Sequence, residues 1–122
     1  TEIYTLSLHD ALPIFLSIAI SDVLVIVVRP DQQDLQGTSV TVDVARSLDV
    51  PAMFIALNKV PRKFDFSQAR QEVQLKFGVP VGAALPLSEE MVELGSADLF
   101  SLLYPDHPWS LAARELADAI LV

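Results

Sequence analysis

Two uncharged apolar runs constrain the fold of this chain more than any other feature. They are Val23–Val28 and Ala52–Leu57, and each stops abruptly at polar residues or proline. A run that is apolar at both even and odd positions is typical of a strand whose two faces are both covered. A helix-compatible segment running to about Leu48 separates the two runs. We therefore expect a parallel β–α–β unit.

Capping and turn residues extend this alternation. We expect Asp34 or Thr38 to cap the helix between the two strands, Ser67 to cap a helix through Phe77, and Gly78 to end that helix. The other expected elements are a helix end at Phe15–Ile20, a loop at Pro61–Phe66, a strand at Val79–Leu85, a short helix from Leu87 to Gly95 and a final helix at Pro108–Leu121. This order predicts an α/β fold: a partial doubly wound parallel sheet of three strands with flanking helices.

Composition narrows the function classes. The 122 residues are 52% hydrophobic, include no cysteine and carry a net charge of −8. These values argue against a disordered chain, disulfides, thiolate metal sites and a broad nucleic-acid contact surface. The two histidines, His9 and His107, are not clustered, so we expect no histidine metal site. Leu12–Val28, the longest apolar stretch, contains Ser17, Ser21 and Asp22 and is too short to span a membrane. Because the absence of cysteine fits a reducing compartment, we expect a cytoplasmic protein.

Residues 1–14, TEIYTLSLHDALPI, differ from the rest of the chain. They show no regular period and resemble a translated sequencing adapter. We interpret residues 1–14 as a non-native segment and residues 15–122 as part of one domain. The alternative is a genuine amphipathic helix that leads into the domain.

Asn58, Lys59, Val60 and Pro61 follow the second strand, at the carboxyl edge where open α/β sheets bind ligands. This tetrapeptide resembles the base-recognition motif of P-loop nucleotidases, which in GTPases is Asn-Lys-x-Asp. The aspartate carboxylate suits guanine because it accepts two hydrogen bonds from the base. Pro61 has no such acceptor, so the sequence favours adenine. The alternative interpretation is that Asn58 only forms a turn.

The segment ISDVLVIVVRPDQQDLQGTSVTVDVARSLDVPAMFIALNKVP resembles the carboxyl-terminal half of MinD/ParA-type ATPases, P-loop proteins with a deviant Walker A lysine. The shared features are strands ending in Arg29-Pro30-Asp31, in Asn58-Lys59 and in Pro86. YPDHPWSLAARELADAIL resembles the terminal helix of these proteins. The resemblance covers about residues 15–122 and implies a P-loop NTPase type of fold.

The resemblance implies an intact parent that binds ATP and Mg²⁺ and forms a homodimer around two ATP molecules, in positioning or partition. Asn58 would contact adenine beside Lys59, and the backbone of Leu85, Pro86 and Leu87 would line the base pocket. The dimer-interface candidates are Asp31, Gln32, Gln33 and Asp34. Alternatively, Asp31 and Asp34 only cap a helix, and Pro86 only ends a strand.

The chain departs from this family at the phosphate end of the site. It has no Lys-Gly-Gly-x-Gly-Lys-[Ser/Thr] loop, which would cradle phosphates and hold magnesium. We therefore assign no catalytic residue and no metal ligand, and expect this chain alone to be inactive and to bind ATP poorly. The alternatives are a non-catalytic α/β module that docks a protein partner, or a GTPase relative that tolerates Pro61.

Three further groups of residues have weaker interpretations. Glu89, Glu90 and Glu93 lie early in a predicted helix, where the helix dipole favours acidic residues. His107 lacks an accompanying nucleophile. The basic group Lys59, Arg62 and Lys63 suits an acidic partner or a phosphate, or is simply solvated. No sequence feature points directly to nucleic acid or membrane.

Overall fold

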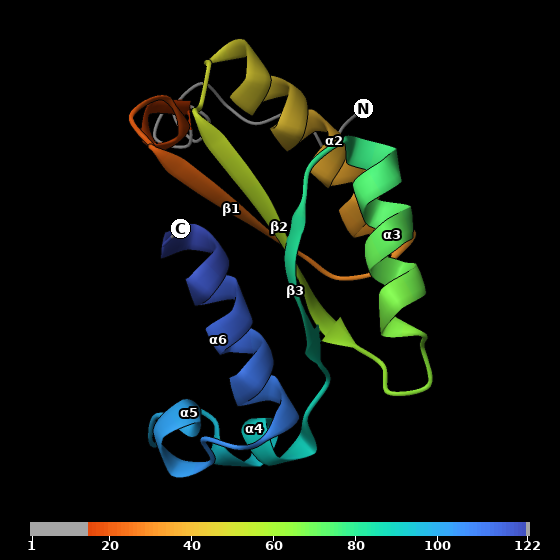
Figure 1. The fold of residues 1–122 in the computed structure, drawn as a ribbon, viewed down its shortest axis with the longest axis vertical. Coiled ribbons are helices and arrows are strands. Elements are labelled where there is room, and N and C mark those ends of the chain that lie inside the picture. Colours follow the sequence, from red (N-terminus) through yellow and green to blue (C-terminus); the bar gives the residue numbers. More distant parts are fainter. Residues whose placement is uncertain (1–14, 122) are drawn as a thin grey trace.

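The computed structural model describes residues 15–121 and contains a three-stranded parallel sheet in the order β1-β2-β3 (Figure 1). The strands are β1 (Val23–Val28), β2 (Ala52–Val60) and β3 (Val81–Pro86). The helices are α2 (Gln32–Ser47), α3 (Phe66–Phe77), α4 (Glu89–Leu94), α5 (Phe100–Leu103) and α6 (Pro108–Leu121), with a further turn of helix at residues 15–19. The predicted α/β class, with three parallel strands and flanking helices, is confirmed. The adapter interpretation concerns residues 1–14, which lie outside the described residues.

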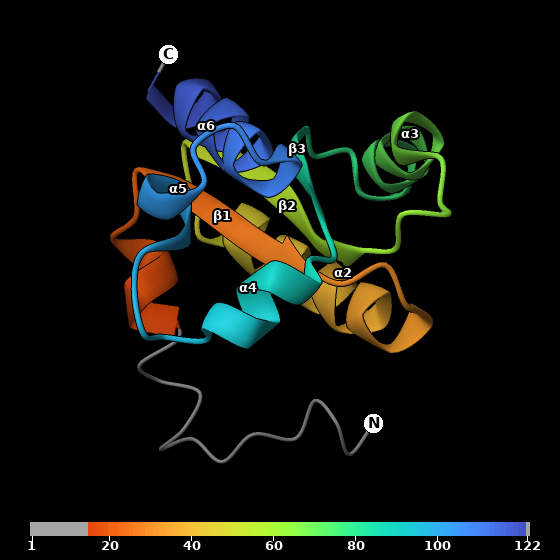
Figure 2. The same ribbon diagram turned by 90° about the horizontal axis from the view of Figure 1, so that it is seen from below.

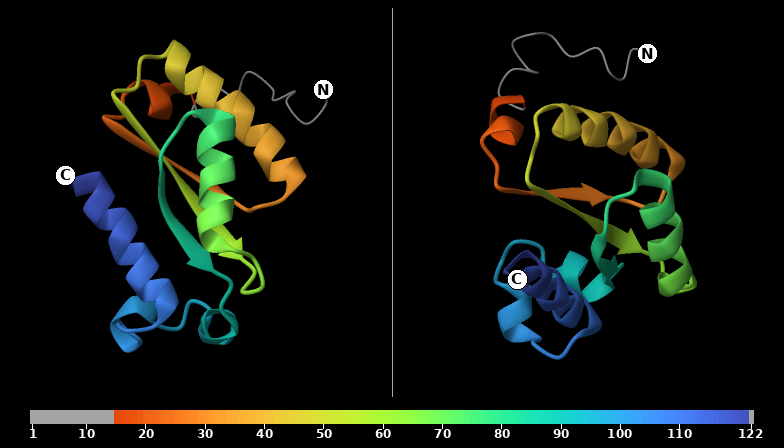
Figure 3. Two further views of the ribbon diagram at one scale, coloured as in Figure 1. Left: turned by 45° about the vertical axis from the view of Figure 1, so that its right-hand side comes forward. Right: turned by 45° about the horizontal axis from the view of Figure 1, so that its top comes forward.

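Helices cover the sheet on both faces. Figures 2 and 3 show α2 and α6 on opposite sides of the strands. Val42 of α2 and both Val73 and Phe77 of α3 belong to the same buried cluster as Ile55 and Leu57 of β2. Both β2 side chains are fully buried. The core therefore lies between β2 and the α2–α3 layer, and α6 closes the other face along β3.

Side chains from α3 satisfy the outer edge of β3. The Val81 N–H donates to Oε1 of Gln74 at 3.0 Å, and the Arg70 guanidinium donates to the Val81 carbonyl at 2.9 Å. The same guanidinium pairs with Glu115 of α6 at 2.9 Å. Every residue of β3 is buried. Although β3 is an edge strand, the backbone N–H and carbonyl of Val81 are therefore already hydrogen-bonded and do not offer an edge for pairing with another chain.

The outer side of β1 is less well covered. Val27 is 63% exposed, and a groove runs beside the strand between Ile18, Leu24 and Thr41. The expectation that both faces of β1 are covered is therefore wrong at Val27 in the described structure. The sequence pattern shows that a strand is apolar on both faces. Whether each face is buried depends on which other segments pack against it.

The helix caps differ from those predicted from the sequence. Asp31 caps α2, because its carboxylate accepts from the Asp34 N–H at 2.9 Å, and Asp65 caps α3 by accepting from the Gln68 N–H at 3.1 Å. Predicted caps Asp34, Thr38 and Ser67 all lie inside the helices. An N-cap needs extended backbone before the first turn, which Asp31 and Asp65 have. Gly78 ends α3 with φ 66°, as predicted.

Further element bounds also shift. The expected loop at Pro61–Phe66 ends one residue early, because α3 begins at Phe66. The third strand begins at Val81 instead of Val79. Pro80 lacks an N–H for the ladder, but its carbonyl accepts from the Ile55 N–H at 2.9 Å. The segment from Ser96 to Tyr104, which has no clear period, contains the short helix α5.

Gly82 allows α6 to approach the sheet. A Cβ at this position would lie 2.7 Å from Cδ1 of Leu116 and 3.7 Å from Cδ1 of Phe54. We expect Gly82→Ala to lower the free energy of unfolding by about 1–2 kcal/mol, and to cost almost nothing once Leu116→Ala has removed the obstructing group. Urea unfolding of the double-mutant cycle measures this. Gly37→Ala is the control: nothing lies within 4 Å of its added Cβ, so it should not destabilise α2. Equal costs in both backgrounds would contradict the close approach.

Arg70 connects α3, β3 and α6. Its hydrogen bond to the Val81 carbonyl and its ion pair with Glu115 should contribute differently to the stability of the fold. We expect Arg70→Met to destabilise the fold by about 1–2 kcal/mol, because the Val81 carbonyl loses a charged donor. Glu115→Gln should cost less than about 0.5 kcal/mol, since Glu115 is half exposed and such pairs are weak. Equilibrium unfolding of the two variants tests this order. A larger effect of Glu115→Gln would mean that the ion pair, and not the edge hydrogen bond, holds the three elements.

Candidate functional site at the carboxyl edge of the sheet

Parallel pairing brings the ends of all three strands to one edge. Val28 of β1 pairs with Leu57, and Val60 of β2 pairs with Pro86. Beyond the strands, the Leu87 N–H continues the ladder by donating to the Val60 carbonyl at 2.9 Å. The residues predicted from the sequence to form the base end of a nucleotide site, Asn58 and Lys59 on one side and Leu85–Leu87 on the other, therefore lie on adjacent paired segments.

A β-bulge marks this edge. From Leu57 to Val60, β2 advances by one residue more than β3 does between the paired residues Ala84 and Pro86. Asn58 and Lys59 thus lie opposite the single residue Leu85, and Lys59 has a φ of 54°. We expected Asn58 and Lys59 to follow the strand, but they lie inside β2, which continues to Val60. Bulges redirect side chains and are common beside active sites.

The side chain of Asn58 is half-buried and makes no hydrogen bond within residues 15–121. A turn-forming asparagine would use its side chain on the nearby backbone, which is not observed here. Leu85 and Pro86 are buried, whereas Leu87 is exposed. The bulge therefore presents an amide with unused donors and acceptors beside one exposed apolar side chain.

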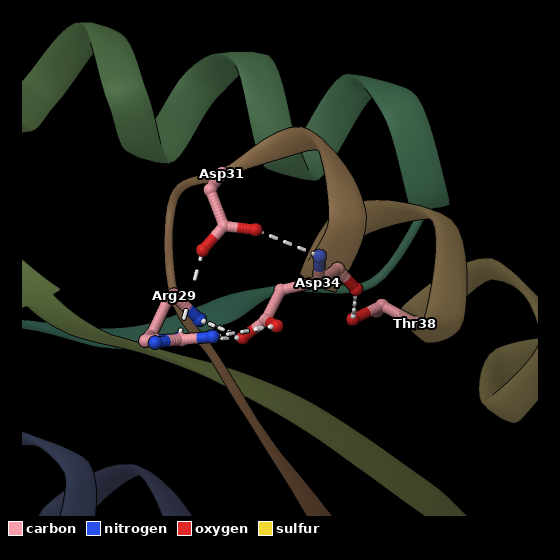
Figure 4. Close-up of polar contacts among 4 residues, drawn as sticks. All are labelled: Arg29, Asp31, Asp34 and Thr38. Atoms are coloured by element: carbon pink, nitrogen blue, oxygen red, sulfur yellow. Dashed lines mark hydrogen bonds and ion pairs between the residues drawn. The ribbon is translucent and has the colours of Figure 1, made fainter. Parts of the chain in front are cut away.

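The loop between β1 and α2 forms a compact ion-pair cluster (Figure 4). The Asp34 carboxylate accepts from the Arg29 backbone N–H at 3.0 Å, from Nε at 3.2 Å and from a terminal guanidinium nitrogen at 3.3 Å. Asp31 lies 3.6 Å from Nε of Arg29. The Thr38 hydroxyl donates to the Asp34 carbonyl at 2.8 Å. The hydrogen bonds from the Arg29 side chain and backbone lower the pKa of Asp34.

Of the dimer-interface candidates, Asp31 and Asp34 are therefore already engaged within the loop. Gln32 and Gln33 occupy the exposed first turn of α2. The capping alternative for Asp31 is confirmed. A role for the loop at a subunit interface remains a prediction.

Two pockets open at the ends of β2 and β3. The first, of about 460 Å³, is lined by Arg62 and Lys63 of the β2–α3 loop, by Glu89 and Glu90 of α4, and by Pro61 and Leu87. The second, of about 590 Å³, shares Arg62 and Glu90 with the first. Its remaining lining residues are Phe66, Ala84, Pro86, His107 and Pro108. Neither pocket includes Asn58 or Lys59. The charged residues that line these pockets are visible in the sequence. They do not predict a pocket there, because basic residues in a loop and acidic residues at the start of a helix are usually solvated.

Ser88, Glu90 and His107 form a connected group beside these pockets. The Ser88 hydroxyl donates to Oε2 of Glu90 at 3.0 Å, and Nε2 of His107 lies 3.6 Å from the same oxygen. The pKa of Glu90 is lowered by its own backbone N–H and by the Ser88 hydroxyl, with smaller effects from His107 and Arg62. Because Ser88 and His107 both contact the carboxylate, this is not a serine–histidine nucleophile pair.

Within residues 15–121, none of the helices has both the length and the apolar character required to span a bilayer. The same residues hold no group of three or more histidine, aspartate or glutamate side chains arranged to bind a metal ion.

Comparison with known proteins finds a structural similarity. No sequence family and no curated protein sequence matches the chain. Among solved structures, the MinD cell division protein of Aquifex aeolicus matches with a TM-score of 0.71 and 13% sequence identity, over 87% of this chain and 46% of the MinD chain. The fold is MinD-like. The chain spans about half the length of that MinD structure, and at this identity the similarity shows the fold alone.

Asp34 should make the stability of the MinD-like fold depend on pH. Its pKa is lower when folded than unfolded, so its contribution is present at neutral pH and is lost as pH falls through the folded pKa, below about pH 4. Asp34→Asn should therefore lower the urea midpoint at pH 7 and converge with the wild type in acid. Asp43→Asn, an exposed change on the same helix, is the control. If the urea midpoints of Asp34→Asn and the wild type differ by the same amount at every pH, the loss of stability comes from the changed shape of the side chain and not from its charge.

Proposed function

We propose that this chain is the base-binding half of a MinD/ParA-like ATPase. The intact parent would bind ATP with Mg²⁺, dimerise, and act in positioning or partition within the cytoplasm. The observation that carries the proposal is the bulge at the carboxyl edge of a MinD-like sheet, where the Asn58 amide makes no hydrogen bond within residues 15–121. Open α/β sheets bind their ligands outside this edge.

The residues fit one end of ATP. The Asn58 amide carries both donors and acceptors, which matches the donor–acceptor edge of adenine. Leu87, which is exposed on the segment paired with β2, would supply apolar contact to the base. Lys59, the residue after Asn58, would lie at the same end of the site. Pro61 occupies the position where a carboxylate would select guanine. The phosphate end has no counterpart in this sequence, which lacks a glycine-rich lysine loop. Phosphate and magnesium binding are therefore proposed for the parent only.

We further propose that the loop from Asp31 to Asp34 faces the second subunit of the parent. The ion pairs of Arg29 with Asp31 and Asp34 fix the shape of this loop at the same sheet edge. Gln32 and Gln33 remain exposed in the first turn of α2 beside it. Such a loop presents amide groups on a rigid base, which suits a contact that forms and dissociates with the state of the nucleotide.

The role of Asn58 is tested in the intact parent. Asn58→Ala should weaken ATP binding by roughly fivefold to tenfold, since a lost neutral hydrogen-bond pair costs about 1–1.5 kcal/mol. Calorimetric titration with ATP and with GTP measures this. Gln71→Ala, an exposed amide on α3, is the matched control. Unchanged affinity after Asn58→Ala would favour a protein-docking module, and equal binding of GTP would favour a GTPase relative.

Purified residues 15–122 provide a second test. We expect no ATP hydrolysis above background from this segment, because the groups that hold and polarise phosphates are not in its sequence. Hydrolysis by the segment would overturn the proposal. Sequencing of the genomic DNA upstream of the codon for Phe15 provides an independent check: a frame encoding a glycine-rich lysine loop supports the ATPase, and a start codon directly before Thr1 contradicts it.

A further inference from the structure

We propose that His107 is a proton-sensitive N-cap of α6 that exchanges partners between α6 and α4. The inference does not depend on the proposed nucleotide site. It rests on the position of one imidazole, which contacts both helices through its two different ring nitrogens.

The first contact is with α6. The Trp109 backbone N–H donates to Nδ1 of His107 at 3.0 Å. Pro108 is the first residue of α6, so His107 occupies the capping position and accepts from the second helical residue, as N-cap side chains do. A nitrogen that accepts a hydrogen bond carries no proton, so this contact requires Nδ1 of His107 to be unprotonated.

The second contact is with α4. Nε2 of His107 lies 3.6 Å from the Glu90 carboxylate, and the histidine side chain is only 14% exposed. Phe100 of α5 packs edge-on against the imidazole with ring centroids 5.0 Å apart. Figure 1 shows α4, α5 and the start of α6 gathered at the same end of the molecule. The imidazole thus lies where three helices meet, with Nε2 on the side of Glu90.

Protonation of this ring would remove one contact and strengthen the other. A proton on Nδ1 leaves two donors, Nδ1–H and the Trp109 N–H, facing each other, so the cap is lost. The imidazolium charge is also unfavourable at a helix N-terminus. The same charge strengthens the interaction with Glu90. Protonation should therefore shift His107 from capping α6 to pairing with α4.

Charged groups of both signs surround the imidazole. Glu90 is the carboxylate that faces the imidazole from α4, and Asp106 precedes His107 in the turn. Arg62, from the β2–α3 loop, lines the same pocket and opposes the imidazolium, while it also interacts with Glu90. Tyr104 of the α5–α6 turn contributes its carbonyl to the His107 N–H. The residues contributed by β3 and α3, Ala84, Pro86 and Phe66, are uncharged.

The consequence concerns the pocket at the sheet edge. Glu90 lines both pockets and His107 lines the larger one. Movement of the imidazole toward Glu90 would loosen the first turn of α6 and draw α4 toward it, which changes the width of the larger pocket. The proposed exchange would therefore make access to that pocket depend on the protonation of His107.

NMR of the wild-type chain tests the proposal directly. At pH 8, ring-nitrogen shifts should show His107 unprotonated at Nδ1 and protonated at Nε2. At pH 5.5, hydrogen exchange at the Trp109 amide, scaled to its intrinsic rate, should be about fivefold less protected than at pH 8. The Val73 amide in α3 serves as the internal reference. The opposite tautomer, or unchanged Trp109 protection, would overturn the proposal.

Two variants distinguish the partner exchange from general acid loosening. His107→Asn keeps a capping oxygen that does not titrate, so Trp109 protection should lose its pH dependence. Glu90→Gln removes the partner of the imidazolium, so the loss of protection should move to lower pH. If His107→Asn retains the full pH dependence, another group is responsible and the proposal fails. The wild-type tautomer and exchange data test the proposal even if one variant does not fold.

Discussion

The structure depends on β2 being paired on both sides and buried. Ile55 and Leu57 have no exposed surface, and backbone hydrogen bonds join the strand to β1 and to β3. Parallel neighbours require crossover helices, which fixes α2 and α3 as the connections. Both helices then cover β2 and bury its apolar side chains. The same pairing places every strand-to-helix loop at one edge, so the position of the candidate site follows from the burial of one strand.

Six of the eight lysine and arginine side chains of this acidic chain fall into two groups, one structural and one at the candidate site. Arg29, Arg46 and Arg70 each hold a carbonyl or carboxylate of a neighbouring segment; Arg46, for example, donates to the Phe77 carbonyl at 2.7 Å where α3 ends. The three cations of the other group, Lys59, Arg62 and Lys63, follow one another along the end of β2. Two of these line a pocket together with the carboxylates of α4. The sheet edge therefore presents both signs of charge, which suits a ligand or partner with mixed polarity better than a simple polyanion.

Features of the fold that depend on neighbouring residues in the sequence were predicted, and features that depend on contacts between distant segments were not. The three strands, α3 with its Gly78 end and the final helix follow from local apolar runs and caps, and all are present. The caps at Asp31 and Asp65 were missed because several candidate residues lie close together, and the backbone geometry decides among them. The bulge at Asn58 and Lys59 was not predictable, since it arises from the register between two strands far apart in sequence. The pairing of Glu90 with His107 also joins distant segments, so neither residue carries a local signal for it.

Energetics explain why the base end of such a site does not act alone. A hydrogen-bonded amide such as Asn58 contributes about 1 kcal/mol, and contact with the exposed part of Leu87 adds a similar amount. Loss of translational and rotational freedom on binding costs roughly 4 kcal/mol or more. The charge of a nucleotide lies on its phosphates, where backbone N–H groups at a helix N-terminus provide the compensating interactions. On the proposed function, the carboxyl edge described here selects which base is bound, and the affinity comes from the phosphate-binding half of the parent.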